Sequence, residues 1–272
     1  MISGGNAMNF NKTLALVIAL LMLSTCLSGC SVVGRLLEKE EKVAVNSIPA
    51  ETEPLQTEPP IYDTVEYTTE KVDYSIYDPS SGKSKVDLYY NKVVLTGDTP
   101  EITAINEHIT KDCDKYVEGL DIAQYQEYAK YAGEYAFMNC FDSAVTNNAD
   151  GIFSIKMSQS WYMGGVFNGN HYGLTYNLHT GKLVDIADIT TLSNSELQSA
   201  IQTSVKNHLN EMYGGAGYGD YYETLDRYSL EDYLFYVENG ELVVTFPTYT
   251  LGPGAAGAVT VNTGIMTSLQ EN

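Results

Sequence analysis

Cysteine and histidine are the side chains of this 272-residue sequence with the most recognisable site chemistry, and there are four of each. Cys26 and Cys30 follow an apolar segment at the N-terminus, whereas Cys113 and Cys140 lie in the body of the chain. Cys113 and Cys140 lack the C-x-x-C spacing of zinc and redox sites. Because the N-terminus indicates export, we expect a disulfide between them, and two buried free thiols are the alternative.

The four histidines are not placed to share a metal or to form a catalytic site. His108 and His208 fall in predicted helices, on or beside the polar faces, where we expect them to be solvated. His171 and His179 fall on one face of a predicted strand, and eight residues of strand separate them by about 26 Å at ~3.3 Å per residue.

Recognised catalytic motifs are also missing from the sequence. It contains no G-x-S-x-G, no H-E-x-x-H and no calcium loop of the EF-hand type. Carboxylate pairs such as Asp185 and Asp188 are expected by chance in so acidic a chain. We therefore predict no catalytic residue, no metal site and no cofactor, and we expect that the protein is not an enzyme.

The stretch SWYMGGVFNGNHYG, residues 160–173, combines four aromatic residues with four glycines. A phosphate-binding loop would need a helix behind it together with a lysine and a hydroxyl, but both flanking segments have strand-like alternation. We interpret the stretch as a hairpin loop and a candidate contact surface. The candidate ligand contacts are Trp161, Tyr162 and Phe167. The glycines expected to supply positive-φ positions are Gly164, Gly165 and Gly169.

The elements that must position this loop are strands and helices in blocks, which predicts an α+β fold: an antiparallel sheet with helices packed on it. Alternation predicts strands at 85–95, 134–145, 152–162 and 171–178, a hairpin turn at Asn239-Gly240, and a last strand through Val259. Helical spacing and capping signals predict helices from Thr99-Pro100, over 122–132, and from the capping box that starts at Ser193.

The N-terminus reads as a secretory signal, because Lys12 precedes an apolar run too short for the about 20 residues of a membrane-spanning helix. The following Leu27-Ser28-Gly29-Cys30 resembles the lipobox of bacterial lipoproteins. The resemblance implies cleavage of the 1–29 signal peptide and attachment of diacylglycerol to the Cys30 thiol. An ordinary signal peptide with a chance cysteine is the alternative.

Residues 30–70 carry glutamates and prolines without apolar periodicity, so we expect a disordered acidic tether outside the cytoplasmic membrane. The formal net charge of -20 argues against nucleic acid as a partner, because phosphates would be repelled. It permits a cationic partner, although solubility alone is the commoner reason for such a charge.

Several short segments resemble the RsiV-like C-terminal domain of Gram-positive exported proteins. They are YMGG at 162–165, LTYNLHTGK at 174–182, the segment from Asp185 to Asp188, and FPTYTLGPGAAGAV at 246–259. The region from Lys85 to about Gly119 is similar to the companion domain that precedes it, also found in a wall peptidoglycan deacetylase. The resemblance implies a companion subdomain at 71–132 and an RsiV-like domain at 133–272.

The resemblance implies an α+β fold, mostly of unknown function, whose best-understood member is the outer part of an anti-sigma factor that senses lysozyme by binding it. Val166-Phe167 stand where that family has Ala-His, so a role of the family histidine does not carry over. We expect a lipid-anchored binding protein that captures a lysozyme-like cationic protein or a wall component. The alternatives are an accessory domain or enzyme acting on wall glycan, and a structural surface lipoprotein.

Overall fold

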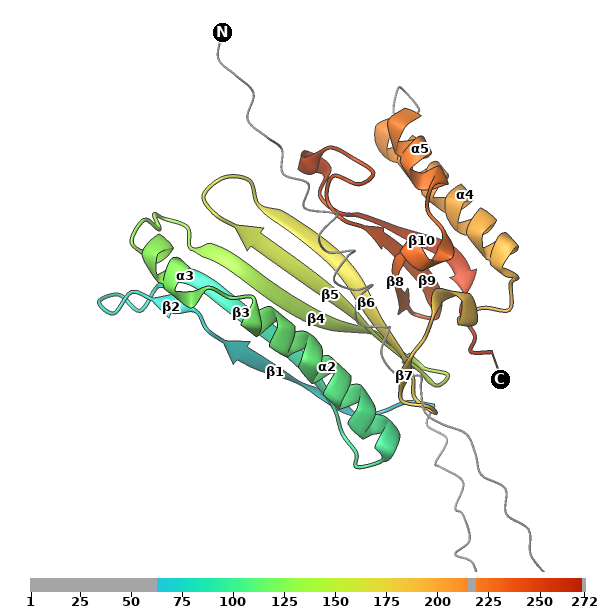
Figure 1. The fold of residues 1–272 in the computed structure, drawn as a ribbon, viewed down its shortest axis with the longest axis horizontal. Coiled ribbons are helices and arrows are strands. Elements are labelled where there is room, and N and C mark those ends of the chain that lie inside the picture. The colour runs from blue at the N-terminus through green and yellow to red at the C-terminus, as the bar shows by residue number, and fades with distance from the viewer. Residues whose placement is uncertain (1–62, 215–218, 271–272) are drawn as a thin grey trace, which may run out of the picture. The chain divides into compact units, whose positions relative to one another are not determined.

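The computed structural model of the chain describes residues 63–214 and 219–270, which form two sheets and the helices packed on them (Figure 1). The predicted signal peptide, Cys30 and the tether up to residue 62 lie outside the described residues. The tether was expected to extend to residue 70, but residues 67–70 form the start of a strand. The main sheet has the order β1-β3-β4-β5-β6-β7, with β2 beside β3, and the small sheet has the order β10-β9-β8.

The strands of each sheet and the helices have the following bounds, in chain order. The main-sheet strands are β1 (Tyr67–Asp73), β2 (Ile76–Tyr77), β3 (Ser84–Leu95), β4 (Phe137–Ala149), β5 (Ile152–Tyr162), β6 (Asn168–Asn177) and β7 (Lys182–Leu183). The small-sheet strands are β8 (Leu234–Glu238), β9 (Glu241–Phe246) and β10 (Val259–Met266). The helices are α2 (Pro100–Glu118), α3 (Ile122–Ala129), α4 (Asn194–Tyr213) and α5 (Gly219–Asp226).

The α+β class is confirmed, but the main sheet is mixed where an antiparallel sheet was expected. β3 and β4 run parallel, whereas the other pairs in both sheets are antiparallel. A parallel pair needs a crossover, and α2 with α3 supplies it between the two strands. As a result, the segments 71–132 and 133–272 share the main sheet and belong to one compact unit.

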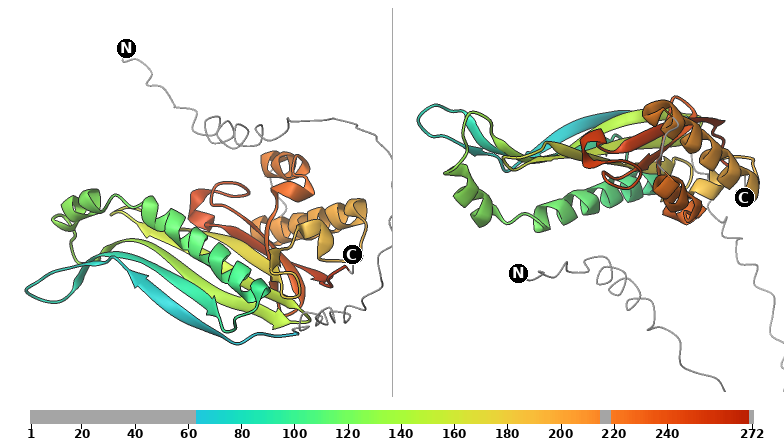
Figure 2. Two further views of the ribbon diagram at one scale, coloured as in Figure 1. Left: turned by 60° about the horizontal axis from the view of Figure 1, so that its bottom comes forward. Right: turned by 90° about the horizontal axis from the view of Figure 1, so that it is seen from above.

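Helix α2 covers one face of the main sheet (Figure 2). The Thr99 hydroxyl accepts a hydrogen bond from the Ile102 backbone N–H, and Pro100 occupies the first helical position, as the sequence predicts. The buried stripe consists of Ile102, Ile105, Ile109 and Cys113, and it packs on the side chains of β5 and β6. None of the described helices is both long and apolar enough to cross a membrane.

Beneath α2, hydroxyls of the sheet meet polar groups of the helix. The carboxylate of Asp112 accepts hydrogen bonds from Tyr90 at 3.0 Å and from Tyr172 at 2.8 Å. His108 Nδ1 lies 2.8 Å from the Tyr176 hydroxyl, so this histidine is paired rather than simply solvated. Burial lowers the pKa of His108 below its usual value.

Cys113 and Cys140 are both free and buried, which corrects the expected disulfide. Phe141 packs on Tyr116 of α2 with ring centroids 4.9 Å apart, so Phe141 faces the helix. Successive side chains of a strand point to opposite faces, so Cys140 points away from the helix that carries Cys113. The Cys140 thiol instead donates to the Asp87 carbonyl of β3 at 3.3 Å, and burial raises its pKa to about 12.

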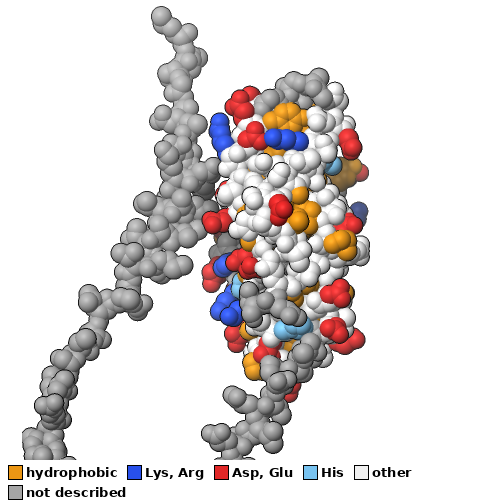
Figure 3. Space-filling model, turned by 90° about the vertical axis from the view of Figure 1, so that its right-hand side faces the viewer, with side chains coloured by type: hydrophobic (Ala, Val, Ile, Leu, Met, Phe, Trp, Pro, Cys, Tyr) orange, Lys and Arg blue, Asp and Glu red, His pale blue; other side chains and the backbone are white. Residues whose placement is uncertain are grey.

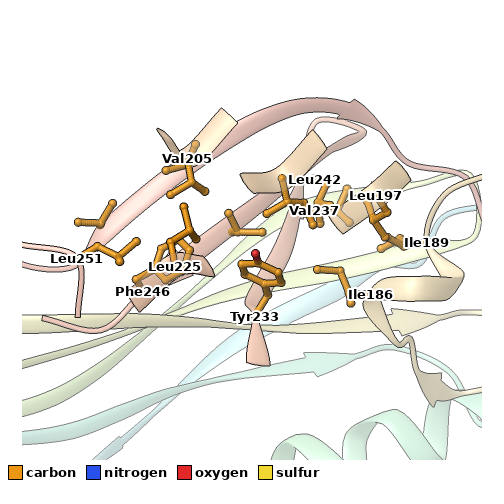
Figure 4. Close-up of a cluster of buried hydrophobic side chains, with 14 of the residues drawn as sticks. Ile186, Ile189, Leu197, Val205, Leu225, Tyr233, Val237, Leu242, Phe246 and Leu251 are labelled. Atoms are coloured by element: carbon orange, nitrogen blue, oxygen red, sulfur yellow. The ribbon is translucent and has the colours of Figure 1, made fainter. Parts of the chain in front are cut away.

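The second hydrophobic core lies between α4 and the small sheet (Figure 4). The predicted capping box is present, with the Ser193 and Glu196 side chains bonded reciprocally to each other's backbone N–H. The buried stripe of α4 consists of Leu197, Ile201, Val205 and Leu209. It packs on strands joined by the predicted Asn239-Gly240 turn, where both residues have positive φ.

The small sheet rests on the face of the main sheet opposite α2. The backbone N–H of Val237 in β8 donates to Ser154 Oγ at 2.9 Å, and Ser154 lies 2.8 Å from the Thr175 hydroxyl. At Gly173 of β6 the approach is closest, because a Cβ atom there would lie 1.8 Å from the Phe235 carbonyl oxygen of β8. This contact requires glycine for space rather than for a positive φ.

We predict that Gly173→Ala lowers the free energy of unfolding by about 3 kcal/mol, the upper end of the usual cost of overpacking. The added methyl group would collide with backbone, which cannot rotate away as a side chain can. Urea unfolding curves measure the change. Gly133→Ala is the matched control, because a Cβ atom at Gly133 meets nothing within 4 Å. Equal stability of the two variants would contradict the prediction.

A second prediction concerns acid. The folded state holds the pKa of His108 below its unfolded value of about 6.5, so the folded state binds fewer protons and loses stability as pH falls below about 6.5. His108→Asn leaves Tyr176 a hydrogen-bond partner but removes the titrating group. Urea unfolding between pH 7.5 and pH 5 should therefore show a shallower loss of stability in the variant, and identical slopes would refute the assignment.

Candidate functional site

The face of the main sheet opposite α2 is covered over only part of its area. Strand β8 covers Ser154 and Gly173. Farther along β5 and β6, beyond β8, every second side chain points to this same face of the sheet. Three rows of side chains lie beyond β8, between Gly173 and the β5–β6 loop, and together they form what we call the open face, although Cys140 within it is buried. The rows are Asn91, Asp142, Ser158 and His171; then Tyr89, Cys140, Ser160 and Gly169; then Asp87, Met138 and Tyr162.

The row next to the covered part is polar and internally hydrogen-bonded. Asp142 accepts from Asn91 Nδ2 at 2.7 Å and from the Tyr89 hydroxyl at 3.3 Å. His171 Nδ1 lies 3.0 Å from Ser158 Oγ, because the β5–β6 register places the two residues opposite each other. The sequence reasoning found no nucleophile beside a base, and this pair is one that only the strand register brings together.

The Ser158–His171 pair has part of the chemistry of a hydrolytic site. Burial, and next the charge of Lys156, lower the pKa of His171, which favours the neutral imidazole that can accept a proton from a hydroxyl. A hydrolytic site also needs donors for a developing oxyanion. Strand β5 lies between β4 and β6, so its backbone N–H groups are used in the two ladders. We therefore regard the pair as part of a polar surface.

The last row of the open face opens into a cavity of about 390 Å³, which we call the aromatic cleft. Its lining residues are Asp87, Tyr135, Ala136, Met138, Tyr162 and Phe167. Two of the rings are unusually exposed for their size, with 70% of Tyr135 and 59% of Phe167 accessible to solvent. Exposed aromatic side chains around a hollow are typical of binding surfaces.

The β5–β6 connection holds Phe167 at this cleft, and it is the hairpin loop that the sequence predicts. Gly164 has φ of 88°, and a Cβ atom there would lie 3.2 Å from the Phe137 ring. Gly165 and Gly169, which were expected to share this role, do not have positive φ. The single left-handed position is enough to turn the chain between the two strands.

Two of the three predicted contacts meet at the aromatic cleft, and the third does not. Tyr162 and Phe167 line it, whereas Trp161 is part-buried and is paired with Asn139 of β4. Trp161 directly precedes Tyr162 in β5, so its side chain points to the opposite face of the sheet. The alternation of the predicted strand already places Trp161 and Tyr162 on opposite faces. The prediction instead grouped the aromatic residues by their closeness in sequence.

The sequence reasoning missed Asp87, Tyr135 and Met138. Asp87 and Met138 lie beside each other because β3 and β4 are parallel, and nothing in the two strand patterns specifies that pairing. Tyr135 lies just before β4, in a segment expected to be strand. Its exposure could not be inferred from residue type, because tyrosine is found both inside and outside folded proteins.

Another exposed aromatic side chain lies on the loop between β9 and β10. Tyr249 is 68% exposed and has φ of 73°, which is unusual for a residue other than glycine. The neighbouring Thr248 fixes this loop to β6, because its N–H donates to Asn170 Oδ1 at 2.9 Å and its hydroxyl donates to the Gly169 carbonyl at 2.7 Å. Backbone strain of this kind is concentrated at binding and active sites.

Acidic side chains are common on the surface of the protein. Figure 3 shows this for the right-hand side of the molecule as drawn in Figure 1, where carboxylates are distributed with hydrophobic side chains between them. Within the cleft, Asp87 Oδ1 accepts a hydrogen bond from Ser84 Oγ at 2.6 Å. In the described part of the chain, no lysine or arginine forms an ion pair with Asp87. The aromatic cleft thus combines aromatic rings with an acidic group that has no ion-pair partner among the described residues, although Lys71 interacts with it over a longer distance.

Comparisons with known proteins place the fold. No protein-family model matches the sequence, and no curated protein matches it either. The chain is similar to a DUF3298 family member from Bacteroides fragilis NCTC 9343, with a TM-score of 0.53 and 16% identity over 74% of this chain and 91% of that one. It is also similar to a DUF3298 family protein from Pseudomonas aeruginosa PAO1, with a TM-score of 0.52 and 12% identity over 78% of this chain and 100% of that one. The chain therefore shares the fold of DUF3298 proteins, a domain of unknown function.

Proposed function

We propose that the chain is an extracytoplasmic binding protein, anchored to the membrane by a lipid on Cys30, that captures a lysozyme-like cationic protein through the open face of its main sheet. The observation that carries the proposal is the aromatic cleft with its exposed rings at Tyr135 and Phe167. A surface with exposed aromatic side chains around a hollow is suited to binding a partner.

The charge of the chain supports a cationic partner. A formal net charge of -20 produces a negative potential that accelerates association with a positively charged protein and disfavours anionic ones. Charge acts mainly on the rate of association, whereas buried aromatic side chains act mainly on the rate of dissociation. The two contributions can therefore be separated by experiment.

The resemblance to the RsiV-like domain points to the same kind of partner, since its best-understood member binds lysozyme. The likeness to DUF3298 structures concerns the fold and does not identify a ligand. In this proposal the lipid on Cys30 holds the binding unit at the outer face of the cytoplasmic membrane. The acidic tether separates the two.

We predict that the full-length chain in non-ionic detergent binds an immobilised basic lysozyme at low salt, measured by surface plasmon resonance. The on-rate should fall at least tenfold between 0.1 M and 1 M salt, as the Debye length shortens from about 10 Å to about 3 Å. Phe167→Ala should raise the off-rate about tenfold and leave the salt dependence unchanged, because it removes an aromatic contact but no charge.

Val166→Ala is the control for the Phe167 variant. Val166 is the adjacent residue and is 66% exposed, but it does not line the cleft. Circular dichroism must first show that both variants are folded. The proposal fails if the unaltered chain does not bind at low salt, and the role of the aromatic cleft fails if the two variants have the same off-rate.

A separate prediction concerns the anchor. Cys30→Ala should abolish incorporation of a tagged fatty acid into this protein, because the thiol is the proposed acyl acceptor. Metabolic labelling of cells that produce the unaltered chain and the variant measures the effect. Cys26→Ala serves as the control and should still be labelled. Labelling that persists in the Cys30 variant would rule out the lipoprotein assignment.

A further inference from the structure

The aromatic cleft places one carboxylate among three aromatic rings. Asp87 of β3 is half-buried and lies beside Met138 of β4, which is in turn paired with Tyr162 of β5. Tyr135 and Phe167 complete the lining from outside the sheet. The only hydrogen bond that Asp87 accepts through its side chain in the described residues comes from Ser84, to Oδ1, so its other oxygen is available to a ligand.

The same face of the sheet already holds an ammonium group by this combination of groups. Lys71 Nζ of β1 lies 4.5 Å from the centroid of the Tyr89 ring and 2.8 Å from the Asp73 carboxylate. Tyr89 stands on β3 two residues from Asp87, and side chains two apart in a strand share a face. The sheet thus supplies its own lysine to one pair of an aromatic ring and a carboxylate. In the described residues no lysine or arginine lies within ion-pair distance of Asp87 or over a ring of the cleft, and Lys71 interacts with Asp87 only over a longer distance.

We propose that the aromatic cleft is a recognition pocket for an arginine side chain presented by the cationic partner. This inference rests on the proposed function and specifies its contact chemistry. A guanidinium group stacks on aromatic faces and donates to a carboxylate through a planar fork, and it is more weakly hydrated than an ammonium group. The cavity of about 390 Å³ is within the range of small-ligand sites, so an entire side-chain terminus can enter.

Two features of the cleft favour a cation over other occupants. A purely apolar side chain would leave the Asp87 carboxylate desolvated without compensation, which is costly. A wall glycan could stack on the rings and donate hydroxyls to Asp87, but the surrounding charge of the chain gives a neutral sugar no preference. The net charge of -20 does give a cationic side chain that preference.

Methionine methyl groups provide a direct test on the full-length chain. Met138 lines the cleft, whereas Met212 of α4 and Met266 of β10 are 43% and 65% exposed elsewhere and serve as internal references. In a chain labelled with ¹³C-methyl methionine, N-acetyl-arginine amide should shift the Met138 resonance saturably and leave the other two unchanged. Met138→Leu identifies the resonance.

The matched probe is N-acetyl-citrulline amide, which has nearly the shape of the arginine probe but no charge. It should bind at least tenfold more weakly, since hydrogen bonds to charged groups are considerably stronger than neutral ones. Equal affinity for the two probes would overturn the proposal, because it would mean that the cleft selects shape only. Preferential saturation of the Met138 resonance by an N-acetylglucosamine oligomer would also overturn it and favour a glycan ligand.

Asp87→Asn should lower the affinity for the arginine probe at least tenfold while keeping the size of the side chain. Asp114→Asn removes the same charge from the exposed surface of α2, on the other face of the sheet, and should leave the affinity unchanged. Equal affinities of the two variants would overturn the role of Asp87. If lysozyme is captured but the arginine probe does not shift Met138, only this inference fails; if lysozyme is not captured, the proposed function fails.

Discussion

The close approach of β8 to β6 at Gly173 determines how the main sheet is used. Where the Phe235 carbonyl lies against this glycine, no side chain can stand between the two sheets, so the small sheet can rest directly on the main one. Hydrogen bonds from Val237 and Thr146 then fasten β8 over the adjoining row. Covering this part with a short sheet leaves the rest of the face open, because three strands of five to eight residues cannot extend over strands of ten to thirteen.

Local signals in the sequence were sufficient for most elements. The Thr99 cap, the Ser193 capping box and the Asn239-Gly240 turn each act over a few residues, and each appears where the sequence predicts it. Pairings between distant segments were not predictable in this way. The parallel alignment of β3 with β4 depends on a crossover of two helices, and the strand patterns alone are compatible with either direction.

The same limit explains two differences between the sequence expectations and the structure. Counting cysteines in an exported chain favours a disulfide, but one step of strand alternation separates Cys140 from Phe141 and turns the thiol away from α2. One step also separates Trp161 from Tyr162 and sends the two rings to opposite faces. Composition indicates which residue types the chain contains. The alternation of side chains along a strand decides which of them lie on the same face and can be in contact. The cleft residues Asp87 and Met138 lie side by side because of the register between β3 and β4, and composition carries no information about register.

Most of the proposed binding surface is built on paired strands rather than on loops. Asp87, Met138 and Tyr162 are held by the ladders of the main sheet, so little conformational entropy is lost when a ligand orders them. Phe167 and Tyr249 lie on connections between strands. The connection with Phe167 leads directly into β6, and the connection with Tyr249 is hydrogen-bonded to Gly169 near the start of β6. In the proposed complex, a surface of paired strands that carries two aromatic side chains favours slow dissociation of the partner. The distributed negative charge of the chain favours fast association. Because the two properties reside in different residues, evolution or design can change the affinity for a partner without changing how strongly salt weakens its approach.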